Sequence, residues 1–130
     1  MKTSRYRLAV AAFATLAFVA AGTPAAVAND DDVIVEGSCS KRSDYKLKAS
    51  PEDGRIEIEG EVDSNRVGQT WRWKLWHNGS LTGKGMRRTS GDSGSFEVRR
   101  VIVDIAGTDW STFKARNLRS GEICRGVVGY

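Results

Sequence analysis

The chain of 130 residues has few of the side chains on which enzymes and metal sites depend. It contains one histidine, two cysteines and two prolines. A cluster of histidine ligands is therefore excluded, and His77 has no sequence neighbour that suggests a nucleophilic relay. A glycine-rich phosphate loop and the spacing of a metal site are also missing. We expect no enzyme activity, no catalytic residue, no metal and no cofactor.

The sequence has only one long apolar run, over residues 8–20. It is shorter than the roughly 20 residues that a transmembrane helix needs. Three basic residues precede this run, and Ala26–Val27–Ala28 follows it, which is typical of a secretory signal peptide. We expect cleavage after residue 28, a secreted, extracellular chain and no membrane span after cleavage. The alternative is an uncleaved anchor.

The charge of the chain is unevenly distributed. The net charge of +4 includes three basic residues of the expected signal peptide, and the rest holds 17 basic and 16 acidic residues. This balance gives little support to a nucleic-acid partner. Residues 29–63 nevertheless hold 5 basic and 11 acidic residues, whereas residues 64–130 hold 12 basic and 5 acidic. The folded domain should therefore have a polarised surface.

No segment has a sustained helical period, and apolar residues alternate with polar ones in most of the chain. This alternation predicts about seven short strands, over residues 45–49, 56–62, 70–77, 81–89, 96–103, 110–117 and 122–128. The pair Asn78–Gly79 is typical of a tight hairpin, and the glycines of the strand after it predict an edge position. Such strand spacing indicates an all-β, antiparallel two-sheet sandwich.

The two cysteines lie near opposite ends of the predicted domain. Cys39 precedes the first predicted strand, and Cys124 lies in the last. An even number of cysteines in an exported chain favours a disulfide, here one that joins the first and last strands. Two free thiols are the alternative. We expect the domain to span residues 38–130, after a flexible acidic spacer over residues 29–37 that lacks the loop geometry of a calcium site.

The segment Asp104–Trp110 and the strand after it resemble a corner found in immunoglobulin-like and fibronectin-like domains. The strand with Trp71 and Trp73 is similar in kind to their tryptophan-bearing strand. The cysteines differ from the antibody pattern, which joins the second and sixth strands. More closely, the chain is similar to small secreted proteins of high-GC Gram-positive bacteria. This resemblance implies an immunoglobulin-like sandwich of bacterial origin outside the cell, and no particular function.

The alternation also predicts a candidate binding surface. If Trp71, Trp73 and Phe113 point inward, their sequence neighbours point outward, and an immunoglobulin-like topology places these strands side by side. The candidate binding residues are Arg72, Lys74, Trp76, Lys114 and Arg116, extended by Arg125. The opposite sheet would carry Glu57, Glu59 and Glu61 with compensating lysines, which we interpret as a solvated face and not as paired catalytic carboxylates.

A cationic face with tryptophan suits anionic polymers of the cell envelope or acidic glycans. We therefore expect a secreted, non-catalytic binding module whose partner is such a polymer or a protein. One alternative is that this face is only solvated and that the loops bind the partner. Two others are a small-ligand carrier with a cleft near Trp76 or Trp110, and an inhibitor that presents residues 90–94 to a secreted protease.

Overall fold

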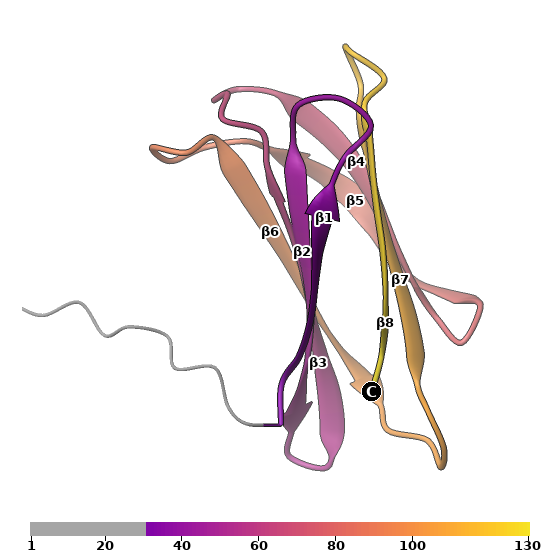
Figure 1. Ribbon diagram of the computed structural model, residues 1–130. Coiled ribbons are helices and arrows are strands. Elements are labelled where there is room, and N and C mark those ends of the chain that lie inside the picture. Colours follow the sequence, from indigo (N-terminus) through magenta and orange to yellow (C-terminus); the bar gives the residue numbers. More distant parts are fainter. Residues whose placement is uncertain (1–30) are drawn as a thin grey trace, which may run out of the picture.

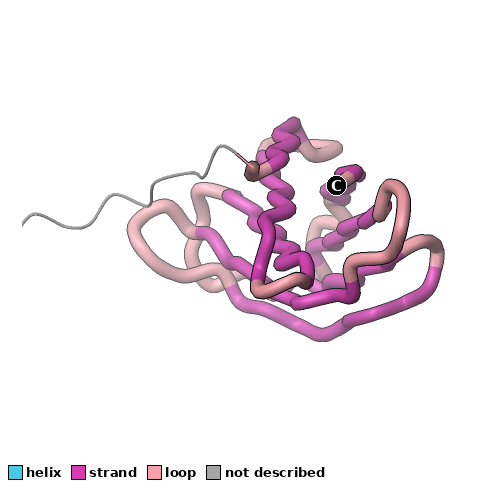
Figure 2. Tube along the Cα trace, turned by 90° about the horizontal axis from the view of Figure 1, so that it is seen from below, coloured by secondary structure: helices cyan, strands magenta, loops and turns pink. Residues whose placement is uncertain are grey.

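The computed structural model describes residues 31–130, which form eight strands in two antiparallel sheets (Figure 1). The strands are β1 (Val33–Ser38), β2 (Asp44–Glu52), β3 (Arg55–Asp63), β4 (Thr70–His77), β5 (Ser80–Arg88), β6 (Ser95–Val103), β7 (Trp110–Asn117) and β8 (Ile123–Gly129). Sheet A has the order β1-β2-β3-β6, and sheet B has the order β5-β4-β7-β8. Strands and loops make up this whole range (Figure 2), so it contains no helix that could cross a membrane.

The predicted all-β sandwich is confirmed, and its core lies between the two sheets. In β3, Ile56, Ile58 and Val62 point inward and are buried, while the glutamates between them lie on the outer face. Trp71 and Trp73 of β4 fill the same interior from the opposite sheet. Burial of such large apolar side chains contributes about 1.5–3 kcal/mol each. The period of two in the sequence therefore sorts side chains between the core and the solvent.

The structure contains one strand more than the seven expected. Strand β1 pairs with β2 along its whole length, from Val33 opposite Ala49 to Ser38 opposite Asp44. The sandwich therefore begins at Val33, inside the segment predicted as a flexible spacer over residues 29–37, and not at residue 38. The alternation in β1 is weak because its side chains are exposed or only partly buried. Residues 29 and 30 of that spacer, like the expected signal peptide, lie outside the described residues.

The hairpin predicted at Asn78–Gly79 is present and joins β4 to β5. Both turn residues have positive φ, 46° at Asn78 and 83° at Gly79, as a type I′ turn requires. Such a two-residue turn fixes the register of the strands that it connects. It places His77 opposite Ser80 and Trp76 opposite Leu81, and a β-bulge between Leu75 and Trp76 then shifts the register by one residue, so that Lys74 lies opposite Lys84.

Strand β5 forms one edge of sheet B, as its glycines predicted. Gly83 and Gly85 leave space for the indole of Trp73, because a Cβ atom at either position would lie 3.1 Å from an atom of that ring. The Arg100 guanidinium covers the same indole at 5.1 Å from the ring centroid. The two glycines therefore allow a large aromatic side chain to pack beneath a thin edge strand.

The predicted disulfide between Cys39 and Cys124 is confirmed. It joins the end of β1 in sheet A to β8 in sheet B. The bridge therefore links the two sheets, and it links the first strand of the domain to the last. Hydrogen bonds support the same junction, since Ser40 N donates to the carbonyl oxygen of Ile123 at 2.8 Å. The Ile123 amide donates in turn to Ser40 Oγ at 2.8 Å.

Removing this cross-link should destabilise the domain. The bridge closes a loop with a sequence separation of 85 residues, so its loss frees the denatured chain and should lower the free energy of unfolding by about 2–5 kcal/mol. Urea unfolding of the Cys39→Ala/Cys124→Ala variant, followed by tryptophan fluorescence, measures this loss. Urea unfolding of the wild-type protein in dithiothreitol removes the bond but keeps both cysteine side chains. Comparison with the variant therefore separates the effect of losing the bond from the effect of losing side-chain packing. A change below about 0.5 kcal/mol in both measurements would contradict the prediction.

Candidate functional site

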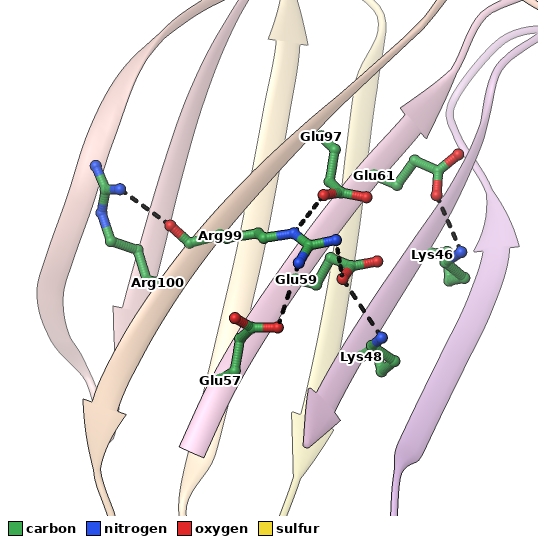
Figure 3. Close-up of polar contacts among 8 residues, drawn as sticks. All are labelled: Lys46, Lys48, Glu57, Glu59, Glu61, Glu97, Arg99 and Arg100. Carbon is green, nitrogen blue, oxygen red and sulfur yellow. Dashed lines mark hydrogen bonds and ion pairs between the residues drawn. The ribbon is translucent and has the colours of Figure 1, made fainter. Parts of the chain in front are cut away.

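The outer face of sheet A carries charges of both signs in contact with one another (Figure 3). Lys46 Nζ lies 3.0 Å from Glu61 Oε2, and Lys48 Nζ lies 3.4 Å from Glu59 Oε2. The hydrogen bond from Lys46 to Glu61 raises the pKa of Lys46 above its usual value. The lysines predicted to compensate the β3 glutamates therefore do so, each from the directly opposite position on β2.

Arg99 of β6 neutralises the same face from the other side of β3. Its guanidinium lies 2.6 Å from Glu97, 3.2 Å from Glu59 and 3.7 Å from Glu57. The hydrogen bond with Glu97 is the main reason why the pKa of Arg99 is raised. Carboxylate oxygens of Glu59, Glu61 and Glu97 approach one another within 4.8 Å. Arg99 and the lysines of β2 neutralise the negative charge of these three glutamates, so the cluster gives no reason to assign a metal ion.

The outer face of sheet B has a different composition, because cations lie next to cations. Arg72 pairs with Arg116 across β4 and β7, and Lys74 pairs with Lys114. Lys84 of β5 lies beside Lys74, and Arg125 of β8 lies beside Lys114. Each strand of sheet B thus contributes one cation to a single row. We call this surface the cationic face, formed by Arg72, Lys74, Lys84, Lys114, Arg116 and Arg125.

Within the part of the chain that the structure describes, these six cations have no acidic partner. None of the ion pairs found among residues 31–130 includes a side chain of the cationic face. Like charges at directly opposed positions of an antiparallel sheet destabilise it. The row of like charges on sheet B therefore lowers the stability of the folded protein, whereas the paired opposite charges on sheet A do not.

A shallow hollow of about 260 Å³ lies on the cationic face. Its lining consists of Arg72, Lys74, Trp76, Lys114 and Arg116. The structure therefore brings together five of the six candidate binding residues predicted from the sequence, and places the sixth, Arg125, next to Lys114. Their role in binding stays a prediction.

Two further residues, Lys84 and Trp110, belong to this surface. The sequence analysis did not name Lys84, and it named Trp110 only for the alternative of a small-ligand cleft. Lys84 lies on the return strand of the hairpin, and its alignment with Lys74 depends on the β-bulge between Leu75 and Trp76, because the Asn78–Gly79 turn alone would place Gly83 opposite Lys74. Trp110 is 56% exposed and begins β7. It lies two residues before Thr112, which is the cross-strand partner of Trp76. Two tryptophans on neighbouring strands therefore border one end of the cationic face.

A buried carboxylate holds this aromatic end in place. Asp109 is 2% exposed and lies 2.5 Å from Nε2 of His77. The side-chain amide of Asn78 donates to Asp109 at 3.0 Å, and the backbone N–H of Ile105 donates at 2.9 Å. Asn78 Oδ1 then accepts a hydrogen bond from the Trp110 backbone N–H at 2.8 Å. The contacts from His77, Ile105 and Asn78 lower the pKa of Asp109, with the bond to His77 as the largest cause.

The pairing of His77 with Asp109 was not expected, because 32 residues separate the two in the sequence. Ser111 lies opposite His77 in the sheet, so all three residue types of a hydrolytic triad are present at this end. Ser111 is 1% exposed, however, and its Oγ makes no hydrogen bond within the described residues. A nucleophile must reach its substrate and its base, and Ser111 meets neither requirement. We therefore interpret the cluster as structural.

Comparison of the chain with protein-family models, with curated proteins and with solved structures gave no match.

The buried carboxylate of Asp109 should make the stability of the folded protein depend on pH in the acidic range. Because the pKa of Asp109 is lowered from its ordinary value of 3.8, the folded state releases this proton more readily than the unfolded state does. Its contribution is fully present above that ordinary value and is lost as the pH falls through the lowered pKa of the folded state. In the Asp109→Asn variant, the loss of unfolding free energy between about pH 5 and pH 2 should be shallower than in the wild type.

Urea unfolding at a series of pH values measures this slope. At pH 7 the variant should also be less stable by about 1–3 kcal/mol, because a buried hydrogen-bonding group loses its partner. Asp53→Asn, at an exposed turn position, is the matched control and should leave the slope unchanged. Equal slopes in the wild type and in Asp109→Asn would show that Asp109 does not contribute to the acid dependence.

Proposed function

We propose that this protein is a secreted, non-catalytic binding module that holds an anionic polymer of the cell envelope against its cationic face. The observation that carries the proposal is the row of cations, one from each strand of sheet B, with no ion-pair partner among residues 31–130. At the spacing of neighbouring strands this row extends over about 14 Å. A bound polymer with repeated negative charges would supply the missing partners.

The contrast between the two sheets supports this function. The same fold pairs its charges on sheet A, where Lys46, Lys48 and Arg99 all contact glutamates. A face that serves only solubility could be built in the same way, with charges of both signs. The repulsion within the row on sheet B is instead relieved when an anionic ligand binds, which strengthens binding and steers the encounter.

The tryptophans at the end of the row indicate the second feature of the ligand. Trp76 lines the hollow between the basic side chains, and Trp110 is exposed close by. An exposed indole ring offers a flat apolar surface for stacking. We therefore propose a polymer whose repeat unit combines an anionic group with a sugar ring.

The shape of this surface favours a polymer over an enclosed small molecule. The hollow beside Trp76, at about 260 Å³, is smaller than the roughly 300–1,000 Å³ typical of small-molecule sites. The disulfide is compatible with an extracellular location, since such bonds persist in oxidising compartments. A module exposed outside the cell would meet anionic envelope polymers directly.

Loss of charge on the cationic face should weaken polymer binding. We expect the Lys74→Gln/Lys114→Gln variant to bind dextran sulfate at least ~10-fold more weakly than the wild type, because two unpaired cations next to the hollow are lost. Biolayer interferometry at low salt measures the affinity, and neutral dextran should not bind. Binding by the wild type should also weaken as salt is added.

A control variant of equal net charge is available in the same chain. Arg55→Gln/Arg87→Gln removes two exposed cations, one from sheet A and one opposite the inward-facing Trp71. This variant should bind dextran sulfate within twofold of the wild type. Equal losses in the two double variants would mean that net charge and not the cationic face determines binding, and no measurable binding by the wild type would overturn the proposed function.

The role of the tryptophan can be tested separately from that of the charges. Linear polyphosphate has the negative charges of the proposed ligand without a sugar ring. Trp76→Ala should therefore weaken binding to dextran sulfate about 10-fold, in the range of a lost stacking contact, and leave polyphosphate binding within twofold. Equal effects on the two polymers would exclude a stacking role for Trp76.

A further inference from the structure

A second group of basic side chains surrounds two adjoining hollows at the disulfide end of the sandwich. One hollow measures about 680 Å³ and the other about 260 Å³. Three residues, Arg66, Gln69 and Ser120, line both. The walls come from the loops between β1 and β2, between β3 and β4, and between β7 and β8. We call the two hollows together the loop cleft, which has the size of a typical small-molecule site.

The charge of this loop cleft is mostly positive. Four cations line it, namely Lys41, Arg42, Arg66 and Arg119, together with one carboxylate, Glu122. The carboxylate is buried and already occupied, since it accepts hydrogen bonds from the Lys41 and Ser43 backbone N–H groups and from Ser43 Oγ. None of the three arginines takes part in an ion pair among residues 31–130. Arg66 lines both hollows, Arg42 lines the smaller and Arg119 the larger, so an anion in the larger hollow could contact the guanidinium groups of Arg66 and Arg119 from two separate loops.

The backbone that carries Arg66 is held firmly. Its carbonyl oxygen accepts hydrogen bonds from Thr89 Oγ1 at 2.5 Å and from Ser64 Oγ at 3.1 Å. Gly94 packs directly against it, and a Cβ atom there would collide with the Arg66 backbone. The Arg66 side chain itself is exposed. A fixed backbone reduces the conformational entropy that binding would cost.

The loop between β7 and β8 is fixed in a similar way. Buried Asn117 accepts hydrogen bonds through its side-chain oxygen from the backbone N–H groups of Arg119, at 2.9 Å, and Ser120, at 3.0 Å. The Ser120 carbonyl oxygen accepts a further bond from Lys41 Nζ at 2.8 Å. This last contact joins the loop to the β1–β2 loop across the smaller hollow. Two walls of the loop cleft are thus tied together before any ligand binds.

The larger hollow also has apolar walls. Val67 and Leu118 line it and are 66% and 44% exposed. Gln69 lies between the two hollows and accepts a hydrogen bond from Trp71 Nε1 at 3.4 Å through its side-chain oxygen, so its amide N–H groups remain available as donors. The loop cleft therefore combines a cationic, donor-rich part with a roomier part that includes aliphatic side chains.

We propose that this loop cleft binds a small molecule with a phosphate monoester at one end and an uncharged body at the other. The phosphate lies among the guanidinium groups, where a doubly charged tetrahedral group can accept several charge-assisted hydrogen bonds. The uncharged body lies against Val67 and Leu118. This site is separate from the cationic face and does not depend on the polymer binding proposed above.

Isothermal titration of the oxidised protein with phenyl phosphate tests the site. The wild type should bind saturably with 1:1 stoichiometry. Arg66→Gln and Arg119→Gln should each weaken binding at least ~10-fold, because each removes a guanidinium from the cleft wall. Both side chains are exposed, so the variants should keep the thermal unfolding midpoint of the wild type. Lys74→Gln/Lys114→Gln, which alters only the cationic face, should bind phenyl phosphate within twofold of the wild type.

Three probes define the ligand class further. Phenol should not bind, and benzoate should bind at least ~10-fold more weakly than phenyl phosphate, because its single charge accepts fewer charge-assisted hydrogen bonds. Inorganic phosphate should also bind more weakly, because it lacks the body that contacts Val67 and Leu118. Absence of saturable binding by the wild type would overturn the proposal, as would equal loss of phenyl phosphate binding in Lys74→Gln/Lys114→Gln. Equal affinity for benzoate would overturn the choice of a phosphate monoester.

Discussion

The antiparallel pairing of β4 with its two neighbours, β5 and β7, determines the surface on which the proposed function depends. Backbone hydrogen bonds set this register, and the side chains follow with a period of two. Lys74 therefore lies between Lys84 and Lys114, and the inward-facing tryptophans of β4 lie in the core. A shift by one residue would bury the lysines and expose Trp71 and Trp73. The core and the cationic face are thus consequences of the same pairing.

The outer faces of sheet A and sheet B differ in how their charged side chains are paired. On sheet A, glutamates of β3 lie between Lys46 and Lys48 of β2 and Arg99 of β6, and each of these basic side chains has a carboxylate within ion-pair distance. On sheet B, the neighbouring strands all supply cations. Surface ion pairs contribute little to stability, so the pairing on sheet A matters mainly because it leaves none of these three basic side chains without a carboxylate partner. The basic side chains on the outer face of sheet B have no such partners among residues 31–130, so their positive charge is available to an anionic ligand.

Both ends of the sandwich are organised by buried polar groups that accept several hydrogen bonds. Asp109 connects the β4–β5 turn to the start of β7 and so fixes the surroundings of Trp110. At the opposite end Glu122 holds the β1–β2 loop close to the disulfide. Buried acceptors of this kind are stable only when their partners are in place. The loops that carry exposed basic and aromatic side chains are therefore held in defined positions.

Local sequence patterns were enough to predict the strands β2 to β8 and the Asn78–Gly79 turn. They also predicted the outward direction of the basic residues on β4 and β7. These features are predictable because alternation and turn chemistry act between residues that are close in the sequence. They did not reveal β1, whose side chains are largely exposed and which is held by backbone pairing with β2. Nor did they bring His77 to Asp109 or place Arg66 beside the β7–β8 loop. The physical reason is that alternation assigns each side chain to a face of its own strand, whereas strand order and register depend on the whole chain and decide which side chains become neighbours.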